Sequence, residues 1–297
     1  MDSARVLVSG ASGLIGQAAV AALSAEGYKV SRLTRSQAQA GDVQWDPSQP
    51  LSPTLVSGFD AVVHLAGESI VGRWTDAKKK RIRESRVLGT RNLAQALAKA
   101  SQRPSVLVCA SAVGYYGSRG DEVLREDSSS GNDFLSEVCR EWESAASPAR
   151  NAGIRTVHTR FGLVLSNTGG ALQKMLLPFR FGVGGRVGSG KQWWSWVDLQ
   201  DVAGGILHAI KSNLQGPVNF VAPNPATNIE FTKVLGSVLS RPTIFPVPAF
   251  AARLAFGQMA DGLLLASQRV EAVKLKESGY QFKFASLKKS LEAILNS

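Results

Sequence analysis

The sequence of 297 residues contains few of the residue types that build covalent or metal-bound frameworks. Two cysteines, Cys109 and Cys139, are too few for a disulfide scaffold or for a zinc site made of cysteines. Three histidines leave little for a histidine-rich metal site. We therefore expect a chain that folds around a hydrophobic core, without a bound metal.

Long hydrophobic runs are also missing. No stretch reaches the roughly 18 apolar residues that a membrane-spanning helix needs. Residues 1–5 do not form a basic segment that leads into an apolar stretch and a cleavage site, so we expect a cytoplasmic protein. Arg253 and Asp261 interrupt the apolar segment 249–265, which we expect to form a lid or a homodimer contact and not a membrane contact.

Acidic residues are in the minority. The chain has 34 lysines and arginines against 23 aspartates and glutamates, which gives a formal net charge of +11. This charge permits anionic partners, and it also fits an ordinary solvated basic surface. The basic residues are dispersed and no recognition motif accompanies them, so we expect no nucleic-acid partner.

The first 35 residues predict a strand–helix–strand unit with glycines at its first turn. A buried strand over residues 5–9 precedes apolar residues at helical spacing, and a second strand follows over residues 28–34. Glycines at such a turn let the backbone approach a pyrophosphate, and the helix start offers free N–H groups. We predict a dinucleotide site, although a purely structural turn is the alternative. The predicted contacts are Gly10, Ser12, Gly13, Leu14, Ile15 and Gly16.

The end of the second strand indicates which dinucleotide is bound. An acidic residue there would bind the ribose 2′-hydroxyl of NAD, but the sequence has Thr34, Arg35 and Ser36. A guanidinium and two hydroxyl groups suit a 2′-phosphate. We predict NADP(H), with Arg35 as the main contact; the alternative is that Arg35 is only an exposed charge.

The later segments continue the alternation of strands and helices. Strands predicted over residues 60–67, 105–110 and 155–160 are separated by helical patterns. This predicts an α/β fold with a Rossmann-type doubly wound parallel sheet and a smaller, mostly helical C-terminal substrate domain. We assign residues 1–165 to the nucleotide domain and expect residues 195–222 to return to the same domain. We assign residues 166–194 and 223–297 to the substrate region.

Several short segments resemble one family. The spacing Gly-x-x-Gly-x-x-Gly is similar to that of the extended, epimerase-like short-chain dehydrogenase/reductases. The chain also resembles an atypical subfamily, whose members are described as epimerase family proteins and sometimes as cell division inhibitors. The similar segments are residues 64–68, 73–74, 85–86, 111–117, 169–172, 188–190, 223–228 and 245–250. The resemblance implies NADP(H) contacts at Thr34, Arg35, Leu65, Ala66, Arg81, Arg86 and Val164. Small residues at the end of the strand predict a further contact at Gly67.

One arginine of the charged segment after residue 78 is predicted to face inward. Ile82, Arg86 and Leu93 share a helix face, and Leu93 is expected to pack on the sheet. Because an unpaired buried charge is costly, we predict a phosphate or carboxylate partner for Arg86. Lys78 and Arg83 fall on other faces, where we expect them to be solvated.

The catalytic pair that the resemblance implies is absent. In this superfamily a tyrosine and a lysine four residues later act together while hydride is transferred. No tyrosine here has a lysine at that spacing, and Phe134 and Val138 lie near the expected positions. Neither side chain can exchange a proton or hold a ribose, so the usual mechanism lacks both of its groups at these positions.

Other polar residues could replace the pair. Ser111 follows a predicted strand end, where ligands bind in open α/β sheets, and Tyr115 and Tyr116 follow on a glycine-flanked turn. We predict Ser111 and Tyr115 as catalytic residues and Tyr116 and Glu68 as pocket residues; packing is the alternative for both tyrosines. A tyrosine with a pKa of about 10 would need a nearby cation such as Arg119.

A tryptophan-rich segment completes the predicted pocket. Trp194 and Trp196 alternate with Trp193, so one face would pack while the other lines a substrate pocket with Gln192. Asp201 is predicted to cap the helix that follows.

Two functions are consistent with these features. The first is an NADP(H)-dependent oxidoreductase or nucleotide-sugar epimerase-like enzyme that acts on a small molecule with a carbonyl or hydroxyl group. The second is an NADP(H) sensor or regulatory binding protein with reduced catalysis, which the missing tyrosine and lysine favour. Turnover of a carbonyl substrate would separate them.

Overall fold

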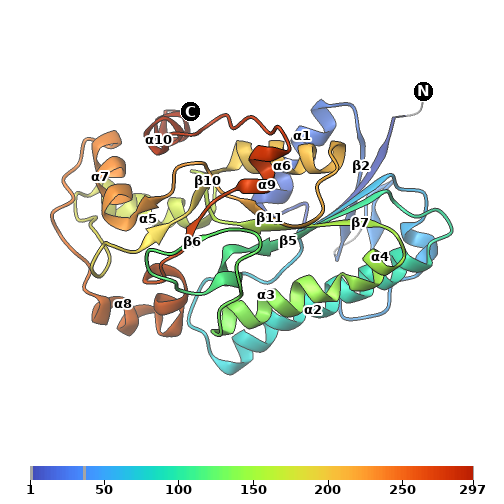
Figure 1. Cartoon of the computed structure of the whole chain (residues 1–297), viewed down its shortest axis with the longest axis horizontal. Coiled ribbons are helices and arrows are strands. Elements are labelled where there is room, and N and C mark those ends of the chain that lie inside the picture. Colours follow the sequence, from blue (N-terminus) through green and yellow to red (C-terminus); the bar gives the residue numbers. More distant parts are fainter. Residues whose placement is uncertain (1–2, 36–37, 297) are drawn as a thin grey trace.

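The computed structural model describes residues 3–35 and 38–296 and has a seven-stranded parallel sheet at its centre (Figure 1). The strand order is β11-β7-β5-β4-β1-β2-β3, and each neighbouring pair is parallel. The order reverses at β1 and β4, so the predicted doubly wound α/β class is confirmed. The strands are β1 (Arg5–Ser9), β2 (Lys29–Thr34), β3 (Val43–Gln44), β4 (Ala61–His64), β5 (Val106–Ala112), β7 (Arg155–Phe161) and β11 (Gly216–Phe220).

Helices cover both faces of this sheet (Figure 1). α1 packs with α6 on one face, and α2 packs with α3 and α4 on the other. Val6 and Val8 of β1 lie in the core under α1 and α6, whereas Leu7 lies with Leu93 of α2. Strands buried on both faces must be apolar throughout, which explains the continuous apolar runs. The helices are α1 (Leu14–Ala25), α2 (Asp76–Lys99), α3 (Phe134–Ala145), α4 (Ser147–Asn151), α6 (Leu199–Lys211) and α9 (Val273–Glu277).

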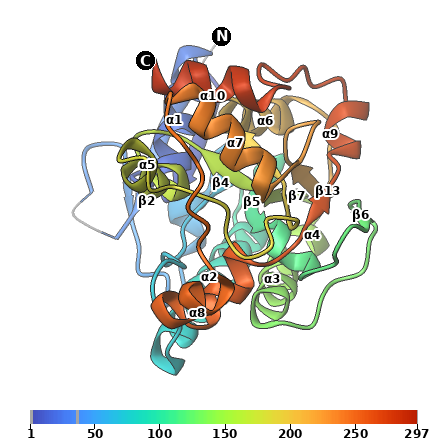
Figure 2. The same cartoon turned by 90° about the vertical axis from the view of Figure 1, so that its left-hand side faces the viewer.

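A smaller, mostly helical region lies at one end of the sheet (left in Figure 1, facing the viewer in Figure 2). Its core joins Leu172 of α5, Phe231 of α7 and Leu291 of α10. The helices are α5 (Gly170–Arg180), α7 (Asn228–Val238), α8 (Ala249–Phe256) and α10 (Leu287–Leu295). Three two-stranded sheets pair β8 (Leu163–Leu165) with β10 (Trp196–Asp198), β9 (Trp193–Trp194) with β12 (Ala226–Thr227), and β6 (Val123–Leu124) with β13 (Arg269–Val270). After β10 the chain returns to the main sheet through α6 and β11.

Two local predictions are wrong. The strand predicted to end before Ser111 continues to Ala112, so Ser111 lies inside β5. The cap of α6 is Asp198, which accepts a hydrogen bond from a backbone N–H of the first helical turn at 2.8 Å. Asp201, the predicted cap, accepts from the Lys283 backbone N–H at 2.7 Å and holds the C-terminal segment against α6.

No helix in the part of the chain that the structure describes is long and apolar enough to cross a bilayer.

Candidate functional site

The turn between β1 and α1 requires glycine at two positions. Gly10 has a φ of +69°, and a Cβ atom there would lie 2.8 Å from the backbone nitrogen of Ala66. A Cβ atom on Gly16 would collide with the carbonyl oxygen of Gly10. Ser12 and Gly13 are exposed, and Gly13 is the N-cap of α1, which has no side-chain cap hydrogen bond. The first N–H groups of α1 are therefore open to an anion.

The segment that follows β7 closes one side of this turn. The side chain of Leu14 lies against Gly169 and Gly170, where added Cβ atoms would approach it to 3.3 Å. Val164 is partly exposed in β8, and its carbonyl oxygen lies beside Gly170. Ile15 packs on the core beneath the turn. The fold thus brings Val164 to the turn although about 150 residues separate them.

His64 holds the ends of β1 and β4 together. Its Nδ1 lies 2.6 Å from the Ser9 hydroxyl, and its Nε2 lies 3.0 Å from the Thr90 hydroxyl. Burial lowers the pKa of His64 to about 4, so the ring is neutral near pH 7. The Ser9 hydroxyl also accepts from the Leu65 backbone N–H. These bonds fix the backbone that leaves β4, which carries the predicted contacts Leu65, Ala66 and Gly67.

A group of cations lies beyond the ends of β2 and β4. Arg35 and Arg81 are exposed, and the Nζ atom of Lys78 lies 2.7 Å from Oε1 of Glu68. The hydrogen bond from Lys78, with the positive charges of Lys78, Arg81 and Arg35, lowers the pKa of the Glu68 carboxyl. The prediction of a solvated Lys78 is wrong, since its side chain is 14% exposed. Lys78 lies one helical turn before Arg81, so the two side chains are neighbours on α2. This spacing is the sequence signal that could have placed Lys78 at the site. Ser36 lies outside the described residues.

Arg86 points inward from α2, as predicted. Its Nη1 donates to the carbonyl oxygens of Glu68 at 2.9 Å and Ile82 at 3.2 Å, and its guanidinium carbon lies 5.0 Å from the Trp142 ring centroid. Burial lowers its pKa. Within residues 3–35 and 38–296 no carboxylate pairs with it, and two carbonyls and an indole are its protein contacts, so the predicted phosphate or carboxylate partner stays a prediction. The remaining guanidinium donors suit a bound anion.

The carboxyl end of β5 carries a buried ion pair instead of a free hydroxyl. Ser111 is 2% exposed and donates to Oε1 of Glu143 at 2.7 Å. The Arg160 guanidinium binds both oxygens of the same carboxylate, at 2.8 and 2.9 Å. The Ser111 hydroxyl is committed to this pair, which contradicts its predicted orientation toward a substrate. Ala112, the next residue, is partly exposed but has no proton to give.

The two tyrosines after β5 have different surroundings. Tyr116 is fully buried, donates to Oδ1 of Asn219 at 2.7 Å and accepts from Arg160 at 2.9 Å. Burial raises the pKa of Tyr116 to about 12, and its predicted place in a pocket is corrected to a place in the core. Tyr115 is partly exposed, and its hydroxyl has no hydrogen-bond partner among the residues described. The cation beside the Tyr115 ring is Arg160, at 3.5 Å, and not Arg119.

The start of α3 is apolar where the superfamily carries tyrosine and lysine. Phe134 lies edge-to-face against Trp74, with ring centroids 5.5 Å apart. Val138 is 2% exposed in a cluster with Ile82 and Met259. These two positions therefore hold no group that can move a proton.

The tryptophan segment packs in the core of the smaller region, so its predicted role in a pocket is not supported. Trp196 is fully buried, and its indole N–H donates to the Asn224 carbonyl at 2.9 Å. Trp194 is 8% exposed and lies edge-on against Phe231. The buried Gln192 amide donates to two backbone carbonyls, each at 3.0 Å. β9 pairs with β12 and β10 pairs with β8, so these strands are not isolated and their tryptophans pack in the core.

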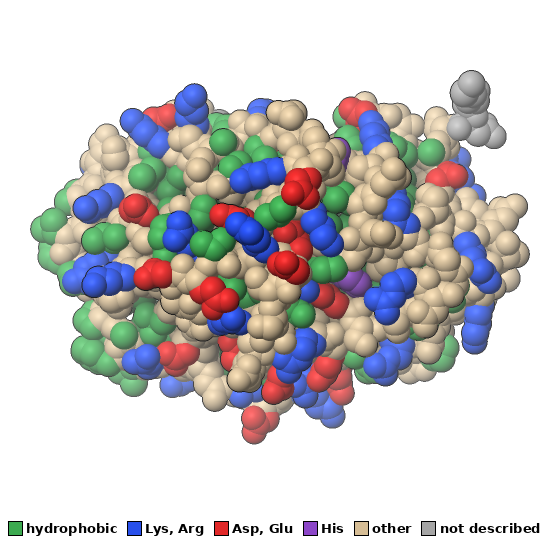
Figure 3. Space-filling model, viewed as in Figure 1, with side chains coloured by type: hydrophobic (Ala, Val, Ile, Leu, Met, Phe, Trp, Pro, Cys, Tyr) green, Lys and Arg blue, Asp and Glu red, His purple; other side chains and the backbone are tan. Residues whose placement is uncertain are grey.

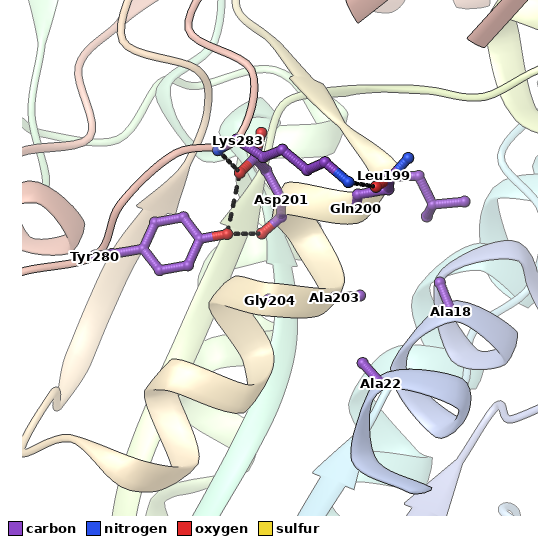
Figure 4. Close-up of a pocket in the computed structure, with 9 residues that line it drawn as sticks. All are labelled: Ala18, Ala22, Leu199, Gln200, Asp201, Ala203, Gly204, Tyr280 and Lys283. Carbon is purple, nitrogen blue, oxygen red and sulfur yellow. Dashed lines mark hydrogen bonds between the residues drawn. The ribbon is translucent and has the colours of Figure 1, made fainter. Parts of the chain in front are cut away.

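A hollow of about 450 Å³ lies between α1 and α6 (Figure 4). Ala18 and Ala22 of α1 lie across it from α6, and none of the predicted contacts lines it. The Tyr280 hydroxyl lies 3.1 Å from Oδ1 of Asp201, and the Lys283 ammonium donates to the Gln200 amide oxygen. Because these polar groups already bond to one another, the hollow offers little to a polar ligand.

Metal and thiol chemistry find no support in the described ranges. No three His, Cys, Asp or Glu side chains there are grouped closely enough to hold a metal ion. Cys109 and Cys139 are buried, and burial raises the pKa of each thiol to about 12. Neither thiol is therefore a ready nucleophile.

The sequence and the fold both match known proteins. Residues 6–221 match the NAD dependent epimerase/dehydratase family, and residues 247–294 match a domain of unknown function. Epimerase family protein Mb2239 of Mycobacterium bovis is 43% identical over 286 residues, which cover 95% of this chain and 94% of that protein.

Two solved structures share both the fold and more than a third of the sequence. The crystal structure of human epimerase family protein SDR39U1 with NADPH has a TM-score of 0.91 and 37% identity, and covers 98% of this chain and 99% of that chain. The nucleoside-diphosphate sugar epimerase from Corynebacterium glutamicum has a TM-score of 0.83 and 38% identity, and covers 99% of this chain and 58% of that chain. The chain therefore belongs to the NAD dependent epimerase/dehydratase family, among its atypical epimerase family proteins.

Proposed function

We propose that the protein binds NADP(H) at the carboxyl ends of β1, β2 and β4 and acts as an oxidoreductase or epimerase on a small carbonyl or hydroxyl compound. The observation that carries this proposal is the rim of three cations, Arg35, Lys78 and Arg81, beside a turn with no room for a Cβ atom. Guanidinium groups bind a phosphate through paired N–H donors. The human relative that was crystallised with NADPH supports the same cofactor.

Each part of this region, which we call the cofactor crevice, would have a role toward such a cofactor. The glycines at positions 10 and 16 leave space for a pyrophosphate at the start of α1. Arg35 and Arg81 would bind the 2′-phosphate, and Arg86 would donate to an anionic or hydroxyl group from behind the β4 loop. When bound, the nicotinamide would supply or take up the hydride. We propose Tyr115 as the proton donor because its hydroxyl is free of partners in the described chain.

A second function, an NADP(H) sensor, is favoured by the apolar start of α3. Phe134 and Val138 replace the catalytic pair, and Ser111 is bonded to Glu143. A protein that only reports cofactor binding needs none of these groups. The two functions share the cofactor crevice and differ in turnover.

Cofactor binding is tested by titration with NADPH and NADH, followed by energy transfer from the tryptophans. We expect tight NADPH binding, and at least about tenfold weaker binding in Arg35→Ala, because a charge-assisted pair contributes about 1.5–3 kcal/mol. NADH binding should change little. Arg91→Ala removes an exposed arginine of α2 and serves as the matched control. Equal affinity for both dinucleotides in the wild-type protein would contradict the NADP(H) proposal.

Catalysis is tested by screening aldehydes, ketones and nucleotide sugars for NADPH oxidation or epimerisation. We expect Tyr115→Phe to slow turnover about 100-fold, since a general acid contributes about 10²–10⁴ in rate, while NADPH affinity is kept. Tight NADPH binding without any turnover would favour the sensor.

A further inference from the structure

Two segments at one end of the molecule, residues 170–192 and 241–261, expose large hydrophobic side chains next to each other. Val187 and Val247 form a β-bridge between them, and Nε of Arg241 donates to the Arg180 carbonyl at 2.9 Å. Of the twelve strongly exposed large hydrophobic residues of the described chain, nine belong to these segments. They form what we call the apolar end patch: Leu177, Phe181, Val183, Ile244, Phe245, Val247, Phe250, Leu254 and Phe256. A patch of this kind on a folded protein marks an interaction surface.

Several side chains of this patch are exposed over most of their surface. Phe181 is 76% exposed, Leu254 is 75% exposed and Ile244 is 73% exposed. Phe250 and Leu254 lie one turn apart on α8, so the outward face of this helix is apolar while Ala252 faces the protein. An exposed apolar helix face can enter the headgroup region of a bilayer while the helix lies on the membrane surface.

The surroundings of the patch are basic. Residues 170–192 and 241–261 contain six lysines and arginines and one acidic residue, Asp261, which is paired with Arg253 at 2.9 Å. Over the left-hand end of the molecule in Figure 3, hydrophobic and basic side chains lie next to each other, with some acidic side chains among them. The six cations are Lys174, Arg180, Arg186, Lys191, Arg241 and Arg253.

We propose that the apolar end patch docks on the surface of a membrane that contains anionic phospholipids. Apolar side chains that enter the headgroup region and cations that face anionic lipids together hold a protein at a bilayer surface. A symmetric contact with a second copy is disfavoured because it would bring two surfaces of the same positive charge together. The sequence-based expectation of no membrane contact rested on Arg253 and Asp261, but these pair with one another, and a short helix need only lie on the surface.

Docking in this way would bring the cofactor crevice close to the lipid. The Leu254 carbonyl of α8 accepts from Arg73 of the loop after β4 at 3.3 Å, and Sδ of Met259, in the segment after α8, accepts from the Gly72 N–H at 3.2 Å. On the other side, α5 begins at Gly170, beside Leu14 of the glycine turn. The two segments of the patch are thus connected to opposite sides of the cofactor crevice. A substrate held in the membrane would have a short path to the crevice.

Co-sedimentation with vesicles tests the proposal. We expect binding to phosphatidylcholine vesicles with about one-third phosphatidylglycerol, loss of that binding in high salt, and little binding to phosphatidylcholine alone. Lys174→Glu with Arg180→Glu should weaken binding at least about tenfold, since each cation near an anionic surface contributes a factor of about five. Phe250→Ser with Leu254→Ser should weaken it similarly without a change of charge.

The matched control variants carry the same types of substitution at exposed positions outside the apolar end patch. Arg91→Glu with Lys99→Glu reverses two exposed cations of α2, and Leu55→Ser with Leu88→Ser removes two exposed leucines outside the patch. Both controls should bind like the wild-type protein. All variants should keep the wild-type unfolding temperature and NADPH affinity, which separates a loss of docking from a loss of folding.

Three results would overturn the proposal. One is no binding to the anionic vesicles at low salt. Another is equal binding by the patch variants and the wild-type protein. The third is a wild-type dimer that Phe250→Ser with Leu254→Ser converts into a monomer in analytical ultracentrifugation, because the patch would then be covered by a second copy of this chain.

Discussion

The two sides of the crevice differ in which parts of a dehydrogenase site they contain. The cofactor side, at the ends of β1, β2 and β4, has a glycine turn that excludes a Cβ atom and a rim with Arg35 and Arg81. The opposite side, at the end of β5 and the start of α3, has Phe134 and Val138 in an apolar cluster; we call it the catalytic side because the superfamily carries its Tyr-x-x-x-Lys pair there. Different elements meet the demands of binding a dinucleotide and of moving a proton, so one can be kept while the other changes.

The largest effect is expected from the buried ion pair on the catalytic side. Glu143→Ala leaves the Arg160 guanidinium, which is 3% exposed, without its carboxylate. Breaking such a pair costs about 3–5 kcal/mol in the free energy of unfolding, which urea unfolding would measure. Glu141→Ala removes a half-exposed acid of the same helix and should cost less than about 1 kcal/mol. Unchanged stability with lost turnover would instead place Glu143 in the chemistry.

Restoring the superfamily pair should be the next most costly change. Phe134→Tyr with Val138→Lys puts an ammonium group where Val138 is 2% exposed, among apolar neighbours. We expect a loss of about 2–4 kcal/mol in the free energy of unfolding, because the buried charge has no partner. Phe134→Tyr alone should cost little, since Phe134 is partly exposed. A stable double variant with increased turnover would show that this side still accommodates the usual mechanism.

On the cofactor side, stability should depend on pH through His64. The unfolded ring takes up a proton below about pH 6.5, whereas the folded ring stays neutral down to a pKa of about 4. The contribution of His64 to the free energy of unfolding is therefore fully present above pH 6.5. It falls by about 3 kcal/mol as the pH decreases toward 4. His158 of β7, with a pKa also lowered to about 4 by burial, should add a similar loss. Urea unfolding of His64→Asn between these pH values should show a clearly smaller slope than that of the wild-type protein, and an unchanged slope would exclude His64 as a source.

The smallest effect is expected at the rim. Glu68→Gln breaks a partly exposed pair with Lys78 and should change the free energy of unfolding by less than about 1 kcal/mol. It also removes a negative charge beside Arg35 and Arg81, so NADPH should bind about two- to threefold more tightly in the fluorescence titration. Glu84→Gln, at an exposed position of α2, is the control. Weaker NADPH binding in Glu68→Gln would mean that this carboxylate contacts the cofactor itself.

Sequence patterns predicted those parts of the fold that depend on interactions between residues close together in the chain. The apolar strand of residues 5–9, the glycine turn and the amphipathic helix after it follow from periodicity and from backbone sterics. The inward side of Arg86 follows from the helical period shared with Leu93. The segment with Trp194 and Trp196 was misjudged because alternation shows two faces of a strand but not which neighbours cover them.

The sequence by itself determined the α/β class, the dinucleotide turn and the lack of a Tyr-x-x-x-Lys pair, because each is a property of short segments. Only the tertiary structure decided which polar groups are already bonded. Ser111 meets Glu143 from 32 residues away, and Tyr116 meets Asn219 from 103 residues away. A hydrogen bond needs its two atoms within about 3 Å. Spacing along the chain cannot specify such a distance, so the bonded and the free hydroxyl groups are told apart only after the chain has folded.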